Sequence, residues 1–285
     1  MKIAVLADIH SNLPALEAVA ADIAAWRPDR VIMAGDVINR GPRPLACLRF
    51  VQSRQREAGW QVVLGNHEDY VLQQGRADAA RSGPEFEIYR NSYWTYKRLG
   101  PAVDHLATMP FQASFAGPDG REVRVVHASM AGTGTGIFPK TTAAELRARI
   151  APPPAVLCVG HTHYPLIREI DDTLVINVGS VGMPFDADRR AAYGRLTWTK
   201  GQWRPEIVRL DYAHDRVEAD FYESGFVDEA GPLTKIMLVE FRQARSHLHL
   251  WMHHFAGPVL AGELSIGEAV TRYLSQLNGD AFSPH

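Results

Sequence analysis

Acidic, imidazole and carboxamide side chains recur in this chain directly after short apolar runs. An apolar run bounded by turn residues is typical of a buried strand, so each of these side chains is expected where a strand ends. Carboxylate, imidazole and amide oxygen are all ligands of divalent metal ions. A single Asp after a strand is more often a turn former or a helix cap, so the prediction depends on the repetition. The residues in these positions are Asp8, His10, Asp36, Asn66, His67, Glu68, His127, His161 and His163.

Five predicted strands position these side chains. In open α/β sheets, ligands bind outside the carboxyl ends of the strands, so five such ends are expected to converge on one patch. Two carboxylates in that patch would repel each other without a counter-charge. The sequence therefore predicts a site for two divalent metal ions. The strands are expected at residues 3–7, 31–34, 62–64, 123–126 and 155–159.

The motifs resemble those of the calcineurin-like metallophosphoesterase superfamily, and they occur in the same order. They are Asp8-x-His10, Gly35-Asp36-x-x-x-Arg40-Gly41, Gly65-Asn66-His67-Glu68, His127, and Gly160-His161-Thr162-His163. The stretch 177–184 resembles the small prokaryotic phosphodiesterase branch, as does Trp94-Thr95 followed by Leu99. The similar segments cover roughly residues 1–210, and five motifs in register are a specific pattern. The resemblance implies an α/β fold in which two mixed β-sheets pack as a sandwich flanked by helices.

The rest of the chain is expected to frame this sandwich. Periodic apolar residues predict helices at 13–26 and 45–56, and further helices within 69–110. Short apolar runs separated by turns predict the remaining strands at 111–116, 121–127, 166–170, 173–178, 191–198 and 203–210.

A C-terminal helical extension at 213–285 is predicted to follow a catalytic domain at 1–212. One long helix is expected at 232–255, begun by Gly231-Pro232 and ended by Gly257-Pro258, and another at 264–277. The extension is expected to cover the cleft or to form a dimer contact. An extra layer on the sandwich is the alternative.

The bulk composition is typical of a soluble globular protein, with 285 residues, 46% hydrophobic and 22% charged. A net charge of −2 offers no general attraction to nucleic acid or to an anionic membrane. No apolar stretch approaches the about 20 residues that would span a bilayer. Met1-Lys2 leads directly into the first strand, which predicts no signal peptide. Cys47 and Cys158 lie in apolar contexts, so we expect a reduced, cytoplasmic protein.

The resemblance also implies the ligand roles. Two ions about 3.5–4 Å apart would acidify a bridging water and clamp the attacked phosphoryl oxygens. No thiolate is present to select the metal, so Mn²⁺ is favoured over Fe, Ni²⁺, Co²⁺ or Zn²⁺. One ion would be held by Asp8, His10 and His163 and the other by Asn66, His127 and His161, with Asp36 as the bridge.

Four neighbouring residues are assigned roles outside the ligand set. His67 is expected near the leaving oxygen as a general acid. Asn39 stands where the protein-phosphatase branch has an Asp that pairs with this histidine, which weakens that role. Arg40 matches the arginine that grips phosphate in the same branch, with a surface ion pair as the alternative. Glu68 is expected to support the site or to begin a helix rather than to bind metal.

Three other features are interpreted as structural. Gly132, Gly134 and Gly136 lack the Lys-Ser/Thr ending of a phosphate-binding loop, so they predict a mobile lid. The aromatic residues between Phe86 and Tyr96 are expected to pack between helices rather than to stack on a base. Four histidines crowd one predicted helix without an acidic third ligand, and they are expected to be solvated or packed: His247, His249, His253 and His254.

The favoured function is metal-dependent hydrolysis of small phosphodiesters or phosphomonoesters, nucleotides among them, by in-line attack of a metal-bridging hydroxide. A protein Ser/Thr phosphatase or a dinucleoside polyphosphate hydrolase is the alternative, supported by Arg40 and residues 65–68. An inactive binding scaffold, as in the related retromer subunit, is disfavoured because every expected ligand is present. A DNA nuclease is disfavoured because the chain has no basic groove for a duplex.

Overall fold

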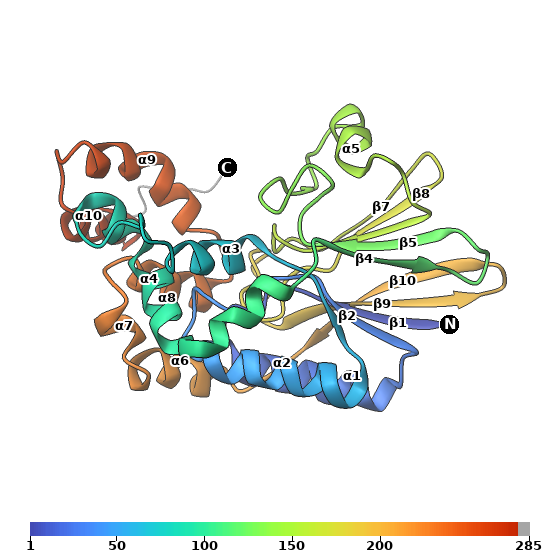
Figure 1. Ribbon diagram of the computed structural model, residues 1–285. Coiled ribbons are helices and arrows are strands. Elements are labelled where there is room, and N and C mark those ends of the chain that lie inside the picture. The colour runs from blue at the N-terminus through green and yellow to red at the C-terminus, as the bar shows by residue number, and fades with distance from the viewer. Residues whose placement is uncertain (279–285) are drawn as a thin grey trace.

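Two five-stranded sheets pack face to face in the computed structural model, which describes residues 1–278 (Figure 1). The last residues of the predicted extension, 279–285, lie outside the described part of the chain. The first sheet has the order β10-β9-β1-β2-β3, and the second has the order β4-β5-β6-β8-β7. Each sheet combines parallel and antiparallel pairs, which confirms the predicted sandwich of two mixed sheets.

In the first sheet, β1, β2 and β3 are parallel, β9 pairs antiparallel with β1, and β10 pairs antiparallel with β9 to form a hairpin. In the second, β5, β6 and β8 are parallel, and β4 and β7 run antiparallel at the edges. The strands of the first sheet are β1 (Lys2–Leu6), β2 (Arg30–Met33), β3 (Gln61–Val62), β9 (Ala191–Thr199) and β10 (Gln202–Leu210). Those of the second are β4 (Gln112–Ala116), β5 (Glu122–Val126), β6 (Val156–Val159), β7 (Leu166–Ile170) and β8 (Thr173–Asn177).

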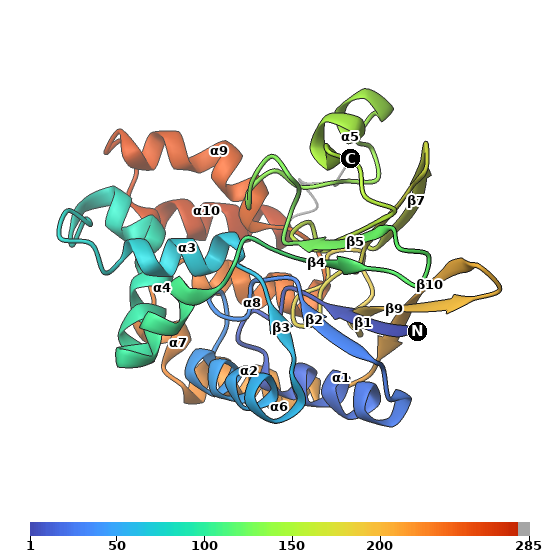
Figure 2. The same cartoon turned by 45° about the vertical axis from the view of Figure 1, so that its right-hand side comes forward.

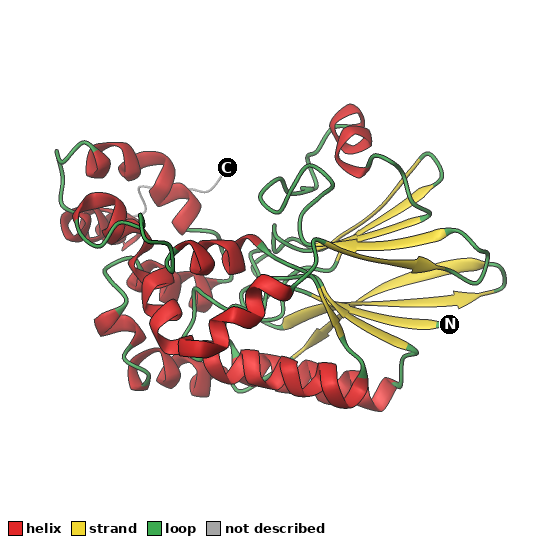
Figure 3. Ribbon diagram, viewed as in Figure 1, coloured by secondary structure: helices red, strands yellow, loops and turns green. Residues whose placement is uncertain are grey.

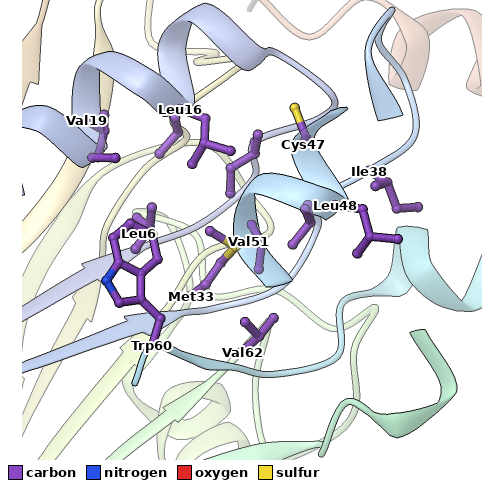
Figure 4. Close-up of a cluster of buried hydrophobic side chains, with 14 of the residues drawn as sticks. Leu6, Leu16, Val19, Met33, Ile38, Cys47, Leu48, Val51, Trp60 and Val62 are labelled. Carbon is purple, nitrogen blue, oxygen red and sulfur yellow. The ribbon is translucent and has the colours of Figure 1, made fainter. Parts of the chain in front are cut away.

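Three apolar layers hold the sandwich together. Between the sheets, buried side chains such as Val5 and Ile32 pack against Val125 and Ile176. Outside the first sheet, α1 (Leu13–Trp26) and α2 (Pro44–Ala58) bury Leu16, Val19 and Val51 against Leu6 and Met33 (Figure 4). Outside the second sheet, α5 (Ala143–Ile150) buries Leu146 and Ile150. The predicted apolar contexts of Cys47 and Cys158 are confirmed, since both thiols are buried and free.

Residues 66–108 form the expected crossover of helices beyond the third strand. They comprise α3 (Asn66–Gln73), α4 (Gly83–Leu99) and the 3₁₀ helix η1 (Gly100–Thr108). Both views place α3 and α4 at the same end of the molecule as the C-terminal helices, away from the tip of the β9–β10 hairpin (Figures 1 and 2). Figure 3 shows, in green, the loops from the strand ends gathering between the strands and these helices.

The C-terminal extension is helical, as expected, but the single long helix predicted at 232–255 is wrong. Helix α8 ends at Gln243, Ala244 turns left-handed with φ 50°, and α9 begins at Leu248. The carboxylate of Glu240 accepts hydrogen bonds from the backbone N–H groups of His247 and Leu248, which stabilises the break. The helices are α6 (His214–Glu223), α7 (Phe226–Glu229), α8 (Thr234–Gln243), α9 (Leu248–Leu260) and α10 (Ile266–Asn278).

The predicted stop at Gly257-Pro258 is also wrong, because Pro258 lies inside α9. A proline inside a helix removes one backbone hydrogen bond, but its fixed φ suits helical geometry. Val259, immediately after it, is 2% exposed, so this turn of the helix packs in the core of the extension.

The core of the extension includes side chains from the crossover. Ile88 and Trp94 of α4 belong to the same buried cluster as Phe226, Trp251 and the other apolar residues of α6–α10. The boundary between residues 212 and 213 stays a prediction. No helix within residues 1–278 is both long and apolar enough to cross a membrane.

Candidate metal centre

The predicted ligand residues meet at the end of the sandwich where the parallel strands finish. Asp8 and His10 follow β1, Asp36 follows β2, Asn66 begins α3, His127 follows β5, and His161 and His163 follow β6. Most of them are removed from solvent; Asp8 and His127 have no exposed surface. Chain segments far apart in sequence therefore deliver polar side chains to one buried patch.

The side chains form two groups on either side of Asp36. Ligand atoms of Asp8, His10 and His163 all lie within 4.8 Å of one another, as do those of Asp36, His127 and His161. Asp36 Oδ2 lies 3.3 Å from His127 Nε2 and 3.8 Å from His10 Nε2, so it faces both groups.

Asn66 completes the group around His127 and His161. Its Oδ1 lies 2.9 Å from His127 Nε2 and 2.9 Å from His161 Nδ1. The two groups, with Asp36 between them, contain all seven side chains of the predicted ligand set.

Backbone carbonyls orient two of the histidines. His127 Nδ1 donates to the carbonyl of Ala34 at 2.7 Å, and His163 Nδ1 donates to that of Met183 at 2.5 Å. Because Nδ1 of each ring donates to a carbonyl, Nε2 is the nitrogen that faces the other ligand side chains. Metal-binding histidines in proteins are held in the same way.

Facing nitrogen atoms and an unsatisfied oxygen fit a cation. His10 Nε2 and His163 Nε2 lie 3.1 Å apart, and His127 Nε2 and His161 Nδ1 lie 3.2 Å apart. Among the described residues, Asp8 Oδ1 is buried without a hydrogen-bond partner, 3.5 Å from His163 Nε2. A buried carboxylate oxygen without a donor is costly unless a cation or proton satisfies it. The residues present therefore fit divalent metal ions.

The charges of the ligand side chains favour a proton on His127, beside the Asp36 carboxylate. Burial alone would lower the pKa of His127, but the adjacent Asp36 carboxylate outweighs it and raises that pKa to about 10. Burial would raise the pKa of Asp36, but the charge of His127 holds it well below its usual value. Burial, followed by the charge of His127, lowers the pKa of His161 to about 4.

Asn39 fixes the orientation of His67. Asn39 Oδ1 accepts from the backbone N–H of Arg40 at 3.0 Å, so its Nδ2 is the group that faces His67 Nδ1 at 3.0 Å. His67 Nδ1 must then accept, and the ring proton lies on Nε2. Burial lowers the pKa of His67 to about 3, and the charge of Arg40 adds to the effect. Neutral His67 therefore offers an N–H donor at the centre. Potential ligand atoms of His67, His10 and Asp36 also lie within 4.8 Å of one another.

Several residues of the centre have strained backbone conformations that the sequence did not indicate. Non-glycine residues rarely adopt positive φ, and such residues cluster at functional sites. Their φ values are 56° for Asp8, 46° for His10, 55° for Asp36, 68° for His161 and 61° for His163.

Glycines allow the loops to approach one another closely. A Cβ on Gly65 would collide with Asp36 Oδ1, and a Cβ on Gly160 would collide with that of Ala7. Glu68 supports the same loops, as expected, since it accepts from the backbone N–H groups of Asp36, Val37 and Gly65 at 2.8–3.0 Å. Glu68 therefore connects the start of α3 to the loop that carries Asp36.

Arg40 forms an ion pair, which was the alternative to phosphate binding, but the pair is buried rather than at the surface. Its guanidinium Nη2 contacts Glu240 Oε2 of α8, and the two side chains are 10% and 0% exposed. The contact joins residues 200 positions apart. The sequence around Glu240 did not identify it as the partner of Arg40, because only the spacing of apolar residues predicted its helix.

A cleft opens from the centre toward the extension, with a volume of about 290 Å³. Arg40, Asn66, His67 and His161 line it on the side of the centre. The opposite wall consists of residues from α3, α4 and the extension that sequence analysis did not assign to a site: Tyr70, Ile88, Tyr89, Leu233, Met237, Ser246, Leu248, His249 and Met252.

The remaining histidine and aromatic features behave mostly as expected. His247 is packed between Tyr273 and Gln243, and Trp94 packs edge-on against Phe226. His249 and Tyr89 are different, because they line the cleft. Within residues 1–278, no group of three potential metal ligands includes the histidines of α9.

The loop that contains Gly132, Gly134 and Gly136 lies beside the centre. A Cβ on Gly136 would come within 2.8 Å of the His161 ring, and Thr133 Oγ1 donates to Asp69 Oδ2 at 3.3 Å. Its role as a mobile lid stays a prediction.

Comparison with known proteins agrees with the fold and the motifs. The calcineurin-like phosphoesterase superfamily domain matches residues 1–201. A metallophosphoesterase structure from Sphaerobacter thermophilus is 26% identical, with a TM-score of 0.67 over 86% of this chain and 99% of that one. An uncharacterized protein of Methanocaldococcus jannaschii is 28% identical over 74% of this chain and 87% of its own length.

Part of the chain also resembles nucleotide hydrolases. The symmetrical bis(5'-nucleosyl)-tetraphosphatase of Haemophilus influenzae is 32% identical over 99 residues, which are 31% of this chain and 34% of that enzyme. The chain thus matches about a third of the length of that relative. Given the match over residues 1–201, this protein belongs to the calcineurin-like phosphoesterase superfamily.

Proposed function

We propose that this protein hydrolyses small phosphate esters, phosphodiesters or phosphomonoesters, with two bound divalent metal ions. The proposal rests chiefly on the two groups of facing ligand atoms on either side of Asp36. The cleft beside them, of about 290 Å³, has room for a small ester. The match to a calcineurin-like phosphoesterase superfamily domain supports the reaction class.

In this proposal, Asp8, His10 and His163 would hold one ion, and Asn66, His127 and His161 would hold the other. Asp36 would contact both. The bound ions would supply a nucleophile from water at neutral pH and compensate the charge of the phosphoryl oxygens. Nitrogen and oxygen ligands without thiolate make Mn²⁺ the first candidate, ahead of Fe, Ni²⁺, Co²⁺ and Zn²⁺.

His67, as the neutral ring, would donate a hydrogen bond from Nε2 to the oxygen of the leaving group, where negative charge develops. Asn39 holds the ring in the tautomer that carries a proton on this nitrogen. This role needs no carboxylate partner for His67, so Asn39 is compatible with it. A positioned hydrogen-bond donor to developing negative charge typically contributes about 10²–10³-fold to the rate.

The test combines metal analysis with a substrate screen. Protein purified without added metal, and then loaded with Mn²⁺, should bind two ions and hydrolyse bis(4-nitrophenyl) phosphate. Asp36→Asn should bind fewer ions and lose at least about 10³-fold in kcat, since two charge contacts disappear. Asp171→Asn, which removes an exposed carboxylate paired with Arg147, is the matched control and should match the parent protein. Full activity of a folded Asp36→Asn protein would contradict the proposal.

Dinucleoside polyphosphate hydrolysis is the second candidate, because several partial relatives are symmetrical bis(5'-nucleosyl)-tetraphosphatases. Bis(5'-adenosyl) tetraphosphate therefore belongs in the screen. A phosphoprotein should be included as well, because Arg40 and residues 65–68 also resemble protein Ser/Thr phosphatases. A higher kcat/KM for either compound than for simple diesters would favour that alternative.

A further inference from the structure

Arg40 is the permanently charged side chain among the residues that line the cleft. Its guanidinium lies 5.6 Å from the ring centroid of Phe185, and that ring stacks on His163 at 4.3 Å. One aromatic ring therefore separates Arg40 from the metal-binding group around His163. A free arginine in this position would add one positive charge to a phosphate site.

The extension supplies a fixed opposite charge. Glu240 has no exposed side-chain surface, and its Oε2 contacts Arg40 Nη2. Its Oε1 accepts from the backbone N–H groups of His247 at 2.9 Å and Leu248 at 2.8 Å. Because both oxygens are engaged, the carboxylate is held against Arg40 by the turn between α8 and α9.

The surroundings make this pairing relevant to a substrate. An apolar wall of the same cleft consists of the almost fully buried Leu233 and Met237 and the partly exposed Leu248 and Met252. Charges interact more strongly beside apolar groups than in water, so a single unit charge affects binding there. The apolar wall also offers a surface for an uncharged organic group of an ester.

Phosphate esters differ in charge at the pH of the cell. A phosphomonoester has a second pKa of about 6 and carries almost two negative charges at neutral pH. A phosphodiester has no second ionisation and carries one. A cleft whose arginine is already neutralised lacks the extra positive charge that would favour the monoester.

The geometry points to Glu240 as a specificity residue: by neutralising Arg40, it makes the cleft select monoanionic phosphodiesters over dianionic phosphomonoesters. The second organic group of the diester packs on Leu248 and Met252, the partly exposed residues of the apolar wall. This inference rests on the proposed phosphoesterase function and narrows its substrate class.

Two esters with the same leaving group test the inference. The metal-loaded protein is assayed with 4-nitrophenyl phosphate and bis(4-nitrophenyl) phosphate, and the ratio of their kcat/KM values is compared between variants. Glu240→Gln frees the charge of Arg40 and should raise the monoester-to-diester ratio about tenfold, equivalent to about 1.4 kcal/mol. Arg40→Met leaves the carboxylate unopposed and should lower the ratio. The double variant Arg40→Met/Glu240→Gln should return it to within about threefold of the parent value, because the net charge is restored.

Glu218→Gln is the matched control, since it removes a carboxylate paired with Arg242 elsewhere on the extension. Its ratio should equal that of the parent. A folded Glu240→Gln protein with an unchanged ratio would overturn the inference, as would a double variant that keeps the raised ratio. If Glu240→Gln does not fold, the other two variants test the inference. It is overturned if the monoester-to-diester ratio does not fall in Arg40→Met, or if the ratio of the double variant differs from that of the parent by more than about threefold.

Equilibrium binding separates this inference from the proposed reaction. Inorganic phosphate at pH 8 is a dianion and dimethyl phosphate is a monoanion, and neither requires turnover. Glu240→Gln should improve binding of phosphate relative to dimethyl phosphate about tenfold. If the parent protein hydrolyses neither ester, the proposed function fails. The ratio of phosphate binding to dimethyl phosphate binding still tests whether Glu240 neutralises Arg40 in the cleft. Equal ratios of phosphate to dimethyl phosphate binding in the parent and in Glu240→Gln would overturn the inference.

Discussion

His127 and His163 show how single residues prepare this centre. Each donates one ring proton to a backbone carbonyl, of Ala34 and Met183 respectively, and presents Nε2 to the neighbouring ligand atoms. The carbonyls belong to the loop after β2 and to the loop after β8, so the ring orientations depend on the packed sandwich. The centre is therefore preorganised by the protein before any ion binds.

The raised pKa of His127 predicts how metal affinity depends on pH. The metal-free protein holds a proton on His127 up to about pH 10, and an ion must displace it to bind. His10 and His161 have lowered pKa values and are already neutral at pH 7. We therefore expect release of about one proton per protein and a Mn²⁺ affinity that rises about tenfold per pH unit between pH 7 and 9.

Calorimetry in buffers of different ionisation enthalpy measures this proton count directly. His247→Gln is the control, since the His247 ring hydrogen-bonds Tyr273 and Gln243 rather than any proposed ligand, and it should keep the same pH slope. A flat affinity over this pH range would contradict the assignment of His127 as a ligand.

His67→Ala tests the role of the donor beside the centre. We expect two ions to remain bound, because the seven proposed ligands are intact. We expect kcat to fall about 10²–10³-fold for esters with poor leaving groups and much less for 4-nitrophenyl esters, whose leaving group carries negative charge with little help from a hydrogen bond. Loss of one ion would show that His67 is itself a ligand, which its position near His10 and Asp36 allows.

Among the elements, α3 connects the centre to the helical end of the molecule. It begins with Asn66 and His67, and Glu68 in its first turn accepts backbone hydrogen bonds from Asp36 and Val37. Gly65 precedes it, in contact with the Asp36 carboxylate. The start of one helix therefore sets the position of three groups of the centre.

Gly65→Ala should damage the centre because its Cβ would collide with Asp36 Oδ1. We expect a decrease of about 1–3 kcal/mol in the free energy of unfolding, together with weaker metal binding. Gly59→Ala is the matched control, since Gly59 ends α2 with φ 65° and a Cβ there would meet open space. It should cost about 1 kcal/mol and leave metal binding unchanged. Denaturant unfolding and metal titration of both variants measure the difference, and normal metal binding by Gly65→Ala would contradict the expectation.

At the scale of the whole molecule, the extension is packed onto the crossover. Phe226 of α7 is fully buried and contacts Trp94 of α4 with ring centroids 5.0 Å apart. Arg40 and Glu240 form a second, polar connection between the sandwich and α8. These contacts predict that the extension and the sandwich unfold together. A dimer contact through the extension stays a prediction.

Phe226→Ala should lower the free energy of unfolding by about 3–5 kcal/mol, because it leaves a cavity in the cluster shared by α4 and α7. Calorimetry should show one transition, shifted to lower temperature, in the parent and in the variant. Tyr222→Ala, which removes an aromatic side chain that is 49% exposed on the neighbouring α6, is the control and should change stability little. Two separate transitions in the parent protein would contradict cooperative unfolding.

Much of the fold was predictable because its signals are local. An apolar run followed by a turn predicted each parallel strand, and apolar spacing predicted α1 and α2. The break at Ala244 was not predictable, because hydrogen bonds from the backbone N–H groups of His247 and Leu248 to the Glu240 carboxylate stabilise it. Helix propensity alone predicts a helix that continues through Ala244. Contacts that exist only in the folded protein end the helix there.

The sequence by itself determined which residues could meet at one edge. Each one directly follows its own strand or begins the next helix, and parallel strands end at the same side of a sheet. Only the tertiary structure decided the partner of Arg40, the second wall of the cleft and the tautomers of the histidines. These depend on contacts between residues up to 200 positions apart, and no periodicity along the chain encodes such contacts.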